Sequence, residues 1–225
     1  MIHISHALGL NNEFIDYDAL EVPVHRALVA PLRELKEAAA QAGFRLGLCS
    51  GYRSFDRQLH IWNQKARGER KLIGAEGAVL DPSHMQAHQI VAAILLWSAL
   101  PGASRHHWGC DFDIVDAAVV EAGYQPELRV EECVQGGAFY ALHCWLNEYL
   151  QQSHCHFYRP YLVSYDYGVA PEPWHLSYQP LASAFAKVLS LESLRQQIEV
   201  SSIELKPAVL ENLEHIYRHY VKRYF

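Results

Sequence analysis

The sequence lacks a long hydrophobic run, and its longest apolar stretch covers only Ile90–Trp97. A membrane-spanning helix needs about 20 consecutive apolar residues, so this stretch is expected to form part of a buried helix. Residues 1–20 contain neither a basic segment nor a continuous apolar segment of the kind found in secretory signals. We therefore expect neither a transmembrane segment nor a secretory signal.

The sequence also lacks a CxxC pair, and its cysteine count is odd. The five cysteines are Cys49, Cys110, Cys133, Cys144 and Cys155. This pattern favours free thiols in a reducing compartment over a disulfide framework. A cytoplasmic location is the corresponding expectation.

Positive charge is scarce, with 19 Lys and Arg against 25 Asp and Glu, which gives a formal net charge of −6. A nucleic-acid partner would require a clustered basic face, so none is expected. Hydrophobic residues make up 50% and charged residues 20% of the chain, as in ordinary globular proteins. The length of 225 residues fits one large domain, or one domain with a helical appendage.

Hydrophobic periodicity predicts both helices and strands. The predicted helices cover residues 24–41, 54–68, 83–100, 138–152 and the tail from 181 onward. The predicted strands cover residues 44–51, 110–115, 161–168 and 172–178, with a loop over 68–84. Because these elements alternate without βαβ regularity, the expected class is α+β.

The segment Pro101–Asp116 concentrates possible metal ligands around Gly109. Two adjacent histidines, His106 and His107, precede this glycine and three aspartates follow it, and adjacent histidines cannot easily face one metal together. Glycine permits the sharp turn that would bring a strand carboxylate under a loop imidazole. Spacing alone leaves open which histidine and which aspartate act together, and a polar turn before a strand is the alternative.

A second segment, "EPWH", supplies the missing partners. His175 would add a second imidazole, and two imidazoles with one carboxylate form a three-ligand zinc site that leaves a position for water. Glu172 stands three residues earlier. A carboxylate at that place could accept a proton from the water and pass it to a leaving amine.

Three ordered motifs resemble those of the VanY-like D-alanyl-D-alanine carboxypeptidases, zinc peptidases that share a fold with Hedgehog signalling domains. They are "SGYRSFDRQ", "SRHHWGCDFD" and "EPWH", and they span residues 50–175. The resemblance does not extend to the helical tail after Leu181. The matched positions are Arg53, Gln58, Ser104, His106, Gly109, Asp113, Glu172 and His175.

The resemblance implies that His106, Asp113 and His175 hold one Zn²⁺ ion and that Glu172 is the general base. It also implies that Arg53 stabilises the oxyanion or holds a substrate carboxylate. The supporting or substrate-binding residues would be Gln58 and Ser104 from the motifs, with Tyr52 and Trp174 as flanking aromatics. Core packing is the alternative interpretation for the two aromatics.

The implied fold is a small antiparallel sheet flanked by helices. A catalytic domain would cover residues 1–180, with a helical extension over 181–225 packed on it. One position departs from the family pattern, since Asp111 stands where a small residue is common. Its carboxylate would either orient a ligand histidine or be solvated at a strand end.

The expected function is a zinc carboxypeptidase that removes the C-terminal D-amino acid from peptidoglycan stem peptides, with D,D or L,D specificity left open. A peptidoglycan endopeptidase of the same chemistry and a non-catalytic zinc-binding module are the alternatives. The oligomeric state is not evident from the sequence.

Overall fold

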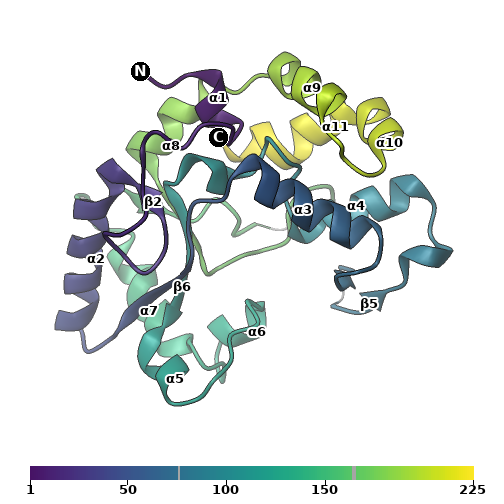
Figure 1. Cartoon of the computed structure of the whole chain (residues 1–225). Helices are drawn as coiled ribbons and strands as arrows, with labels where there is room; N and C mark the ends of the chain where they lie inside the picture. The colour runs from purple at the N-terminus through teal and green to yellow at the C-terminus, as the bar shows by residue number, and fades with distance from the viewer. Residues whose placement is uncertain (76, 164–165) are drawn as a thin grey trace.

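The computed structural model describes residues 1–75, 77–163 and 166–225, and it has a mixed α+β architecture (Figure 1). The main sheet is antiparallel, in the order β3 (Leu46–Ser50), β6 (Asp111–Asp116), β8 (His175–Tyr178) and β7 (Phe157–Tyr158). Two short hairpins pair β1 (Ile15–Asp16) with β2 (Val24–His25), and β4 (Leu72–Ile73) with β5 (Val79–Leu80). The predicted α+β class with a small antiparallel sheet is confirmed.

The helices flank this sheet and are distributed along the whole chain. The α-helices are α1 (Ile4–Ala7), α2 (Val29–Gln41), α3 (Phe55–Ala66), α4 (Ala87–Trp97), α5 (Ala117–Glu121), α6 (Val130–Cys133), α7 (Tyr140–Tyr149), α8 (Gln179–Ala186), α9 (Leu191–Val200), α10 (Lys206–Glu211) and α11 (Leu213–Ile216). Short helices η1 (Arg26–Leu28), η2 (Pro82–His84), η3 (Arg105–Trp108), η4 (Tyr217–Val221) and η5 (Lys222–Tyr224) complete the list. None of the described helices combines the length and the apolar character needed to span a bilayer.

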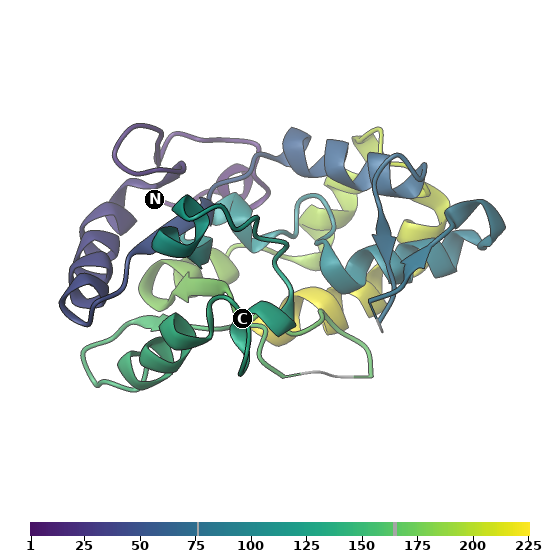
Figure 2. The same cartoon turned by 90° about the horizontal axis from the view of Figure 1, so that it is seen from below.

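The two faces of the main sheet differ in chemistry because side chains alternate along each strand. Phe112, Ile114 and Leu176 lie on one face, in a buried cluster with α2 and α7. Figures 1 and 2 both place these two helices on the same side of the molecule. Asp111 and Asp113 lie on the opposite face and are also buried. The strand predicted at 110–115 is confirmed, and its polar face is available for a site inside the protein.

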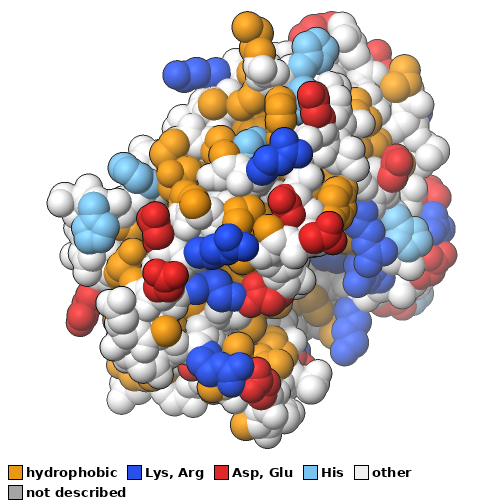
Figure 3. Space-filling view, turned by 60° about the vertical axis from the view of Figure 1, so that its left-hand side comes forward, with side chains coloured by type: hydrophobic (Ala, Val, Ile, Leu, Met, Phe, Trp, Pro, Cys, Tyr) orange, Lys and Arg blue, Asp and Glu red, His pale blue; other side chains and the backbone are white. Residues whose placement is uncertain are grey.

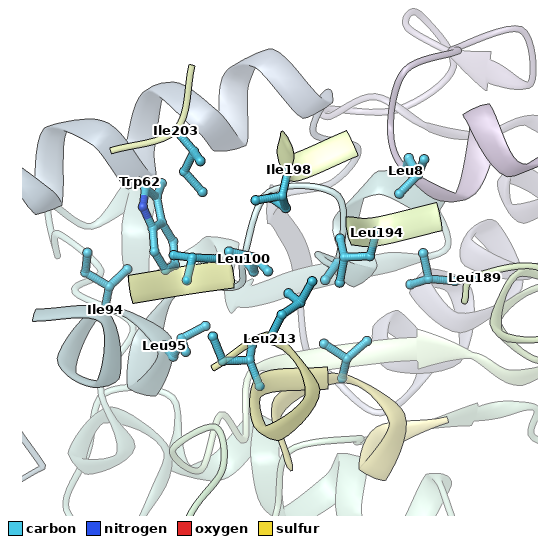
Figure 4. Packing of buried hydrophobic residues seen from close by; sticks show 14 of the residues in the cluster. Leu8, Trp62, Ile94, Leu95, Leu100, Leu189, Leu194, Ile198, Ile203 and Leu213 are labelled. Atoms are coloured by element: carbon cyan, nitrogen blue, oxygen red, sulfur yellow. The ribbon is translucent and has the colours of Figure 1, made fainter. Parts of the chain in front are cut away.

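A second core joins the C-terminal helices to the middle of the chain. Side chains of α3 and α4 converge there with those of α9 and α11, around Trp62, Leu194 and Leu213 (Figure 4). The indole nitrogen of Trp62 donates to the carbonyl oxygen of Glu204 at 3.1 Å. This packing places residues 181–225 in a core shared with residues 1–180, while the division into two domains stays a prediction.

Several predicted elements differ from the observed ones. The helix predicted from residue 24 begins at Val29, because residues 24–28 form β2 and η1. The helix predicted from residue 83 begins at Ala87, where Gln86 caps it reciprocally with Gln89. The tail is helical but broken, and Leu205 between α9 and α10 has a left-handed backbone with φ +60°.

The strand predicted over residues 161–168 is wrong for the described part of that range. Residues 161–163 and 166–168 form no strand, and residues 164–165 lie outside the described part of the chain. The edge strand β7 lies just before it, and Pro160 follows β7 closely. Proline has no N–H to donate to a ladder, which is consistent with pairing that ends there. The predicted loop over 68–84 also contains the β4–β5 hairpin.

Charged side chains of both signs are interspersed over much of the face shown in Figure 3, and several Lys and Arg side chains lie close together toward its right side. The full chain carries 25 Asp and Glu against 19 Lys and Arg.

Gly109 ends η3 and turns the chain into β6 with a left-handed φ of +66°. A Cβ built at this position would lie 2.6 Å from Cδ1 of Ile15 and 2.8 Å from the backbone nitrogen of His25. Glycine is therefore required here both by the backbone conformation and by the close approach of β2.

We expect Gly109→Ala to lower the free energy of unfolding by more than Gly43→Ala. Both glycines have positive φ, +66° and +88°, so both substitutions carry strain of about 1–2 kcal/mol. A Cβ at Gly43 meets nothing within 4 Å among the described residues, whereas one at Gly109 meets backbone. Urea unfolding of the two variants measures the difference, and equal losses would contradict the role of crowding at Gly109.

Candidate metal centre

Three elements bring the predicted ligands together on the polar face of the sheet. His106 comes from η3, Asp113 from β6, and His175 opens β8, where it pairs in register with Asp113. One ligand atom of each residue lies within 4.8 Å of the others, and all three residues are buried. The rings of the two histidines stand nearly perpendicular, with their centroids 4.9 Å apart.

Each histidine is held so that one ring nitrogen faces Asp113. His106 Nδ1 donates to the carbonyl oxygen of Gly51 at 2.8 Å, which leaves the lone pair of Nε2 3.5 Å from Asp113 Oδ2. His175 Nε2 donates to Asp111 Oδ1 at 3.1 Å, which leaves the lone pair of Nδ1 3.1 Å from Asp113 Oδ1. These bonds fix the ring tautomers in the manner typical of metal-binding histidines.

Two buried atoms of the arrangement have no hydrogen-bond donor from the rest of the described chain. They are His175 Nδ1 and Asp113 Oδ1, which are solvent-inaccessible and face each other at 3.1 Å. Two lone pairs that face each other inside a protein are stabilised by a cation. The separations of 3.1 and 3.5 Å are also close to the edge of a tetrahedron built on zinc bonds of about 2.0–2.1 Å. Two imidazoles and one carboxylate thus fit Zn²⁺ in chemistry, and the separation of each imidazole nitrogen from the carboxylate fits the length of zinc bonds.

The charges around the ligands affect the two imidazoles differently. Burial, together with Arg53 and His175, lowers the pKa of His106 to about 3 despite the opposing effect of Asp113. Burial also acts to lower the pKa of His175, but Asp111 and Asp113 outweigh it and raise this pKa to about 9. Without a metal ion, a proton on Nδ1 therefore lies between His175 and Asp113 at neutral pH, and a bound metal ion would displace that proton. The pKa of Asp113 is lowered, because the two histidines and Arg53 outweigh the effect of burial.

Glu172 lies beside the ligands on the segment that leads into β8. Its Oε2 is 3.6 Å from His175 Nδ1, and its side chain keeps 15% of its surface exposed. Its backbone N–H donates to Tyr161 O at 2.7 Å, and its carbonyl accepts from the His175 N–H at 3.0 Å. Burial raises the pKa of this carboxyl to about 7, with Asp113 adding to the rise and His175 and Arg53 opposing it.

Arg53 is held next to His106 by its backbone, and its side chain is fixed by further hydrogen bonds. Its N–H donates to His106 O at 3.0 Å, and its carbonyl accepts from His107 Nδ1 at 2.6 Å. Its guanidinium donates to Gln58 Oε1 at 2.8 Å and to Ser50 Oγ at 3.2 Å. His107 is therefore a link between η3 and Arg53, because its other nitrogen, Nε2, accepts from the Gly102 N–H at 3.0 Å.

The four remaining predicted residues lie at different depths. Gln58 is fully buried, and its Nε2 donates to Ala99 O at 2.7 Å. This second bond fixes the side chain whose Oε1 accepts from Arg53. Ser104 is buried at the start of η3. Trp174 is 4% exposed, which leaves little of its ring for a substrate. Tyr52 is half-buried and its ring meets that of Tyr17 edge-on at 6.5 Å. Their contacts with a substrate stay predictions.

The structure decides between the two interpretations of Asp111. This carboxylate is fully buried, accepts from His175 and also accepts from Arg105 Nε at 2.8 Å. It therefore orients His175, a predicted ligand, and is not solvated. The sequence analysis missed Arg105, although it stands between Ser104 and His106 in the matched motif.

Arg105 is itself buried and uses all of its nitrogens. It donates to Ser177 Oγ and to Tyr158 OH, both at 2.7 Å, and to Tyr224 O at 2.8 Å. Ser177 Oγ donates in turn to Asp111 Oδ2 at 3.1 Å. The carboxylate that orients His175 is thus neutralised and held from several sides.

Comparisons with known proteins agree with this geometry. The sequence profile described as VanY, D-alanyl-D-alanine carboxypeptidase, matches residues 21–181. An uncharacterised protein of Haemophilus influenzae is 34% identical over 123 residues, which cover 54% of this chain and 92% of the relative. The profile match includes every residue of the candidate metal centre.

A solved structure shows the same fold. A Zn(II) complex of a point variant of VanY, a vancomycin-resistance D,D-pentapeptidase from a VanB-type cassette, is 20% identical and has a TM-score of 0.51. The similarity covers 88% of this chain and 92% of that chain. The LD-carboxypeptidase LdcB is 22% identical with a TM-score of 0.48, and the similarity covers 80% of this chain and 72% of that chain.

We expect Asp111→Asn to weaken zinc binding about 10-fold to 100-fold, as is typical for the hydrogen-bond partners of metal ligands. An amide keeps the shape of the side chain but lacks the charge that polarises His175. Competition with a chromophoric chelator measures the affinity, and circular dichroism checks the fold. Asp116→Asn, on the same strand but at the cap of α5, is the control and should bind zinc as the wild type does. Equal affinities of the two variants would contradict the role of Asp111.

Proposed function

The chain belongs to the VanY family of D-alanyl-D-alanine carboxypeptidases, and we propose that it is a zinc-dependent carboxypeptidase that removes the C-terminal D-amino acid from peptidoglycan stem peptides. Family membership confirms the resemblance found in the three sequence motifs. The observation that carries the proposal is the buried pair His175 Nδ1 and Asp113 Oδ1, which have no other hydrogen-bond partner among the described residues, with the Glu172 carboxylate beside them.

His106, Asp113 and His175 would hold the ion. When bound, zinc supplies Lewis acidity, which polarises a carbonyl and lowers the pKa of water from 15.7 toward about 7. Glu172 has the position and the raised pKa of a proton carrier. Its Oε2 accepts the proton of the attacking water and returns it to the departing amine nitrogen, which balances the hydrolysis.

Arg53 supports the transition state through its fixed guanidinium. Its side chain is anchored by Gln58 and Ser50, so its remaining N–H groups are already oriented before a substrate arrives. A positioned cation stabilises the negative charge that develops on the carbonyl oxygen without reorganising at that moment. A carboxylate of the substrate is the other partner that this guanidinium could take.

Two other functions are compatible with the same residues. An endopeptidase would cut within the stem peptide and would not require a free carboxylate at the end of its substrate. A non-catalytic zinc-binding module would keep the ligands but would not need Glu172 and Arg53 next to them. The retention of both residues favours an enzyme. Specificity for D,D or L,D bonds and a cytoplasmic location stay predictions.

Zinc-loaded protein is expected to release D-alanine from peptides that end in a free carboxylate, with mass spectrometry of treated muropeptides as the readout. Matched peptides with a C-terminal amide separate a carboxypeptidase, which should spare them, from an endopeptidase, which should cut both. Chelation should stop the release, and added zinc should restore it. Tight zinc binding without hydrolysis of any peptide would contradict the proposal and favour the binding module.

Glu172→Gln is expected to reduce kcat by about 10²–10⁴-fold, since the amide cannot carry the proton. Zinc affinity should change little, because Glu172 is not among the three grouped ligands. D-alanine release and chelator competition measure the two quantities. A variant with wild-type turnover would remove Glu172 from the mechanism, and one that loses zinc would make it a ligand instead.

A further inference from the structure

A further arginine, Arg159, is partly buried, and its Nε is solvent-inaccessible without a hydrogen-bond partner among the described residues. It directly follows β7, and its Nη2 donates to Nδ1 of His143 at 3.0 Å on α7. Its Nη1 donates to Oδ1 of Asn147 on the same helix. Within residues 1–75, 77–163 and 166–225, no ion pair joins Arg159 to an aspartate or glutamate. Both contacts position the guanidinium, but neither one neutralises it.

Arg159 is charged, and the neighbouring side chain of His143 does not neutralise this charge. Burial lowers the pKa of Arg159 to about 10, so the group is still charged at neutral pH. Burial and Arg159 itself lower the pKa of His143 to about 3, so this ring is neutral. His143 Nδ1 accepts from Arg159, and its proton is therefore on Nε2. His143 Nε2 and Arg159 Nε are both buried donors without an acceptor.

Such an arrangement is costly unless an anion completes it. A buried cation is normally paired, and each buried donor without an acceptor is penalised. A guanidinium has five N–H donors in a planar fork that matches a carboxylate. His143 and Asn147 use two of the five, so N–H groups are left for an anion.

Arg159 lines a cavity that adjoins the catalytic segment. The cavity has a volume of about 230 Å³, and its wall includes Pro171 and Pro173, the residues on either side of Glu172. A second cavity of about 460 Å³ shares Arg159 and Asn147 and continues along α7. The first volume is below the range of about 300–1,000 Å³ that holds whole ligands. It is suited to one side chain of a larger molecule.

We propose that this cavity binds a carboxylate of the peptide substrate on the N-terminal side of the scissile bond, with Arg159 as its counter-ion and His143 and Asn147 as the groups that orient Arg159. The inference rests on the proposed function, because it assumes a peptide bound over Glu172. A peptide is the natural occupant, since the cavity wall and the general base belong to the same three residues of the chain.

The experiment compares two peptides that both end in D-Ala-D-Ala. One carries a side-chain carboxylate at a single upstream position, and the other carries the carboxamide there, with each upstream position tested in turn. Binding of both peptides to zinc-loaded Glu172→Gln is measured by calorimetry, and KM and kcat for the wild type are measured by D-alanine release. At one upstream position, the peptide with the carboxamide should bind at least about tenfold more weakly than the peptide with the carboxylate. Its KM should be higher by the same factor, with kcat little changed.

Arg159→Met should remove the preference and weaken binding of the acidic peptide to the level of its amide. Arg218→Met, on the exposed face of the C-terminal helices, is the control and should keep the preference. Wild-type protein that binds acid and amide equally at every position, or that binds neither peptide, would overturn the inference whether or not Arg159→Met folds. D-alanine release without a preference would overturn only this inference, whereas binding with a preference but without release would contradict only the proposed function.

Discussion

The metal centre depends on one buried ion pair, that of Arg105 and Asp111. The carboxylate is fully buried and fixes the tautomer of His175, so it has to be charged in a place where charge is costly. Arg105 makes this possible at 2.8 Å, and Ser177 adds a further hydrogen bond. Removing one member of such a pair typically costs about 3–5 kcal/mol, because the other charge is then left unpaired. The geometry of the ligands is therefore tied to the stability of the fold.

This ion pair also connects the C-terminal segment to the site. Arg105 donates to the carbonyl of Tyr224, and the hydroxyl of Tyr224 accepts from the N–H of Val169 at 2.9 Å. The ring of Tyr224 packs against Tyr161 at 4.8 Å, and Tyr161 packs against His175 at 4.9 Å. The last turn of the chain thus supports the segment that carries Glu172. Residues beyond the matched family segment, which ends at residue 181, therefore help to hold the candidate metal centre in place.

Local patterns in the sequence predicted the parts of the site that depend on one element. Alternation placed Asp111 and Asp113 on one face of β6, because the side-chain period of a strand is local. The choice between His106 and His107 was not local, since it depends on the carbonyls of Gly51 and Arg53 more than fifty residues earlier. For the same reason spacing could not reveal Arg105, whose partners come from β6, β7, β8 and the C-terminus. Only the family resemblance selected His106, the histidine that lies in the candidate group with Asp113 and His175.

The same electrostatic rule distinguishes the buried Arg105 from the partly buried Arg159. Arg105 meets a carboxylate of its own chain, together with neutral acceptors, and it is closed off from solvent with 3% of its surface exposed. Among the described residues, the guanidinium of Arg159 donates to His143 and Asn147 and to no carboxylate, and Arg159 lines two cavities. Burying a cation is tolerable in the first case because its counter-charge is built in. For Arg159, the fold holds the guanidinium in place without supplying a counter-charge. An anionic group of a ligand would then gain the most binding free energy at this position, because it would supply the missing counter-charge.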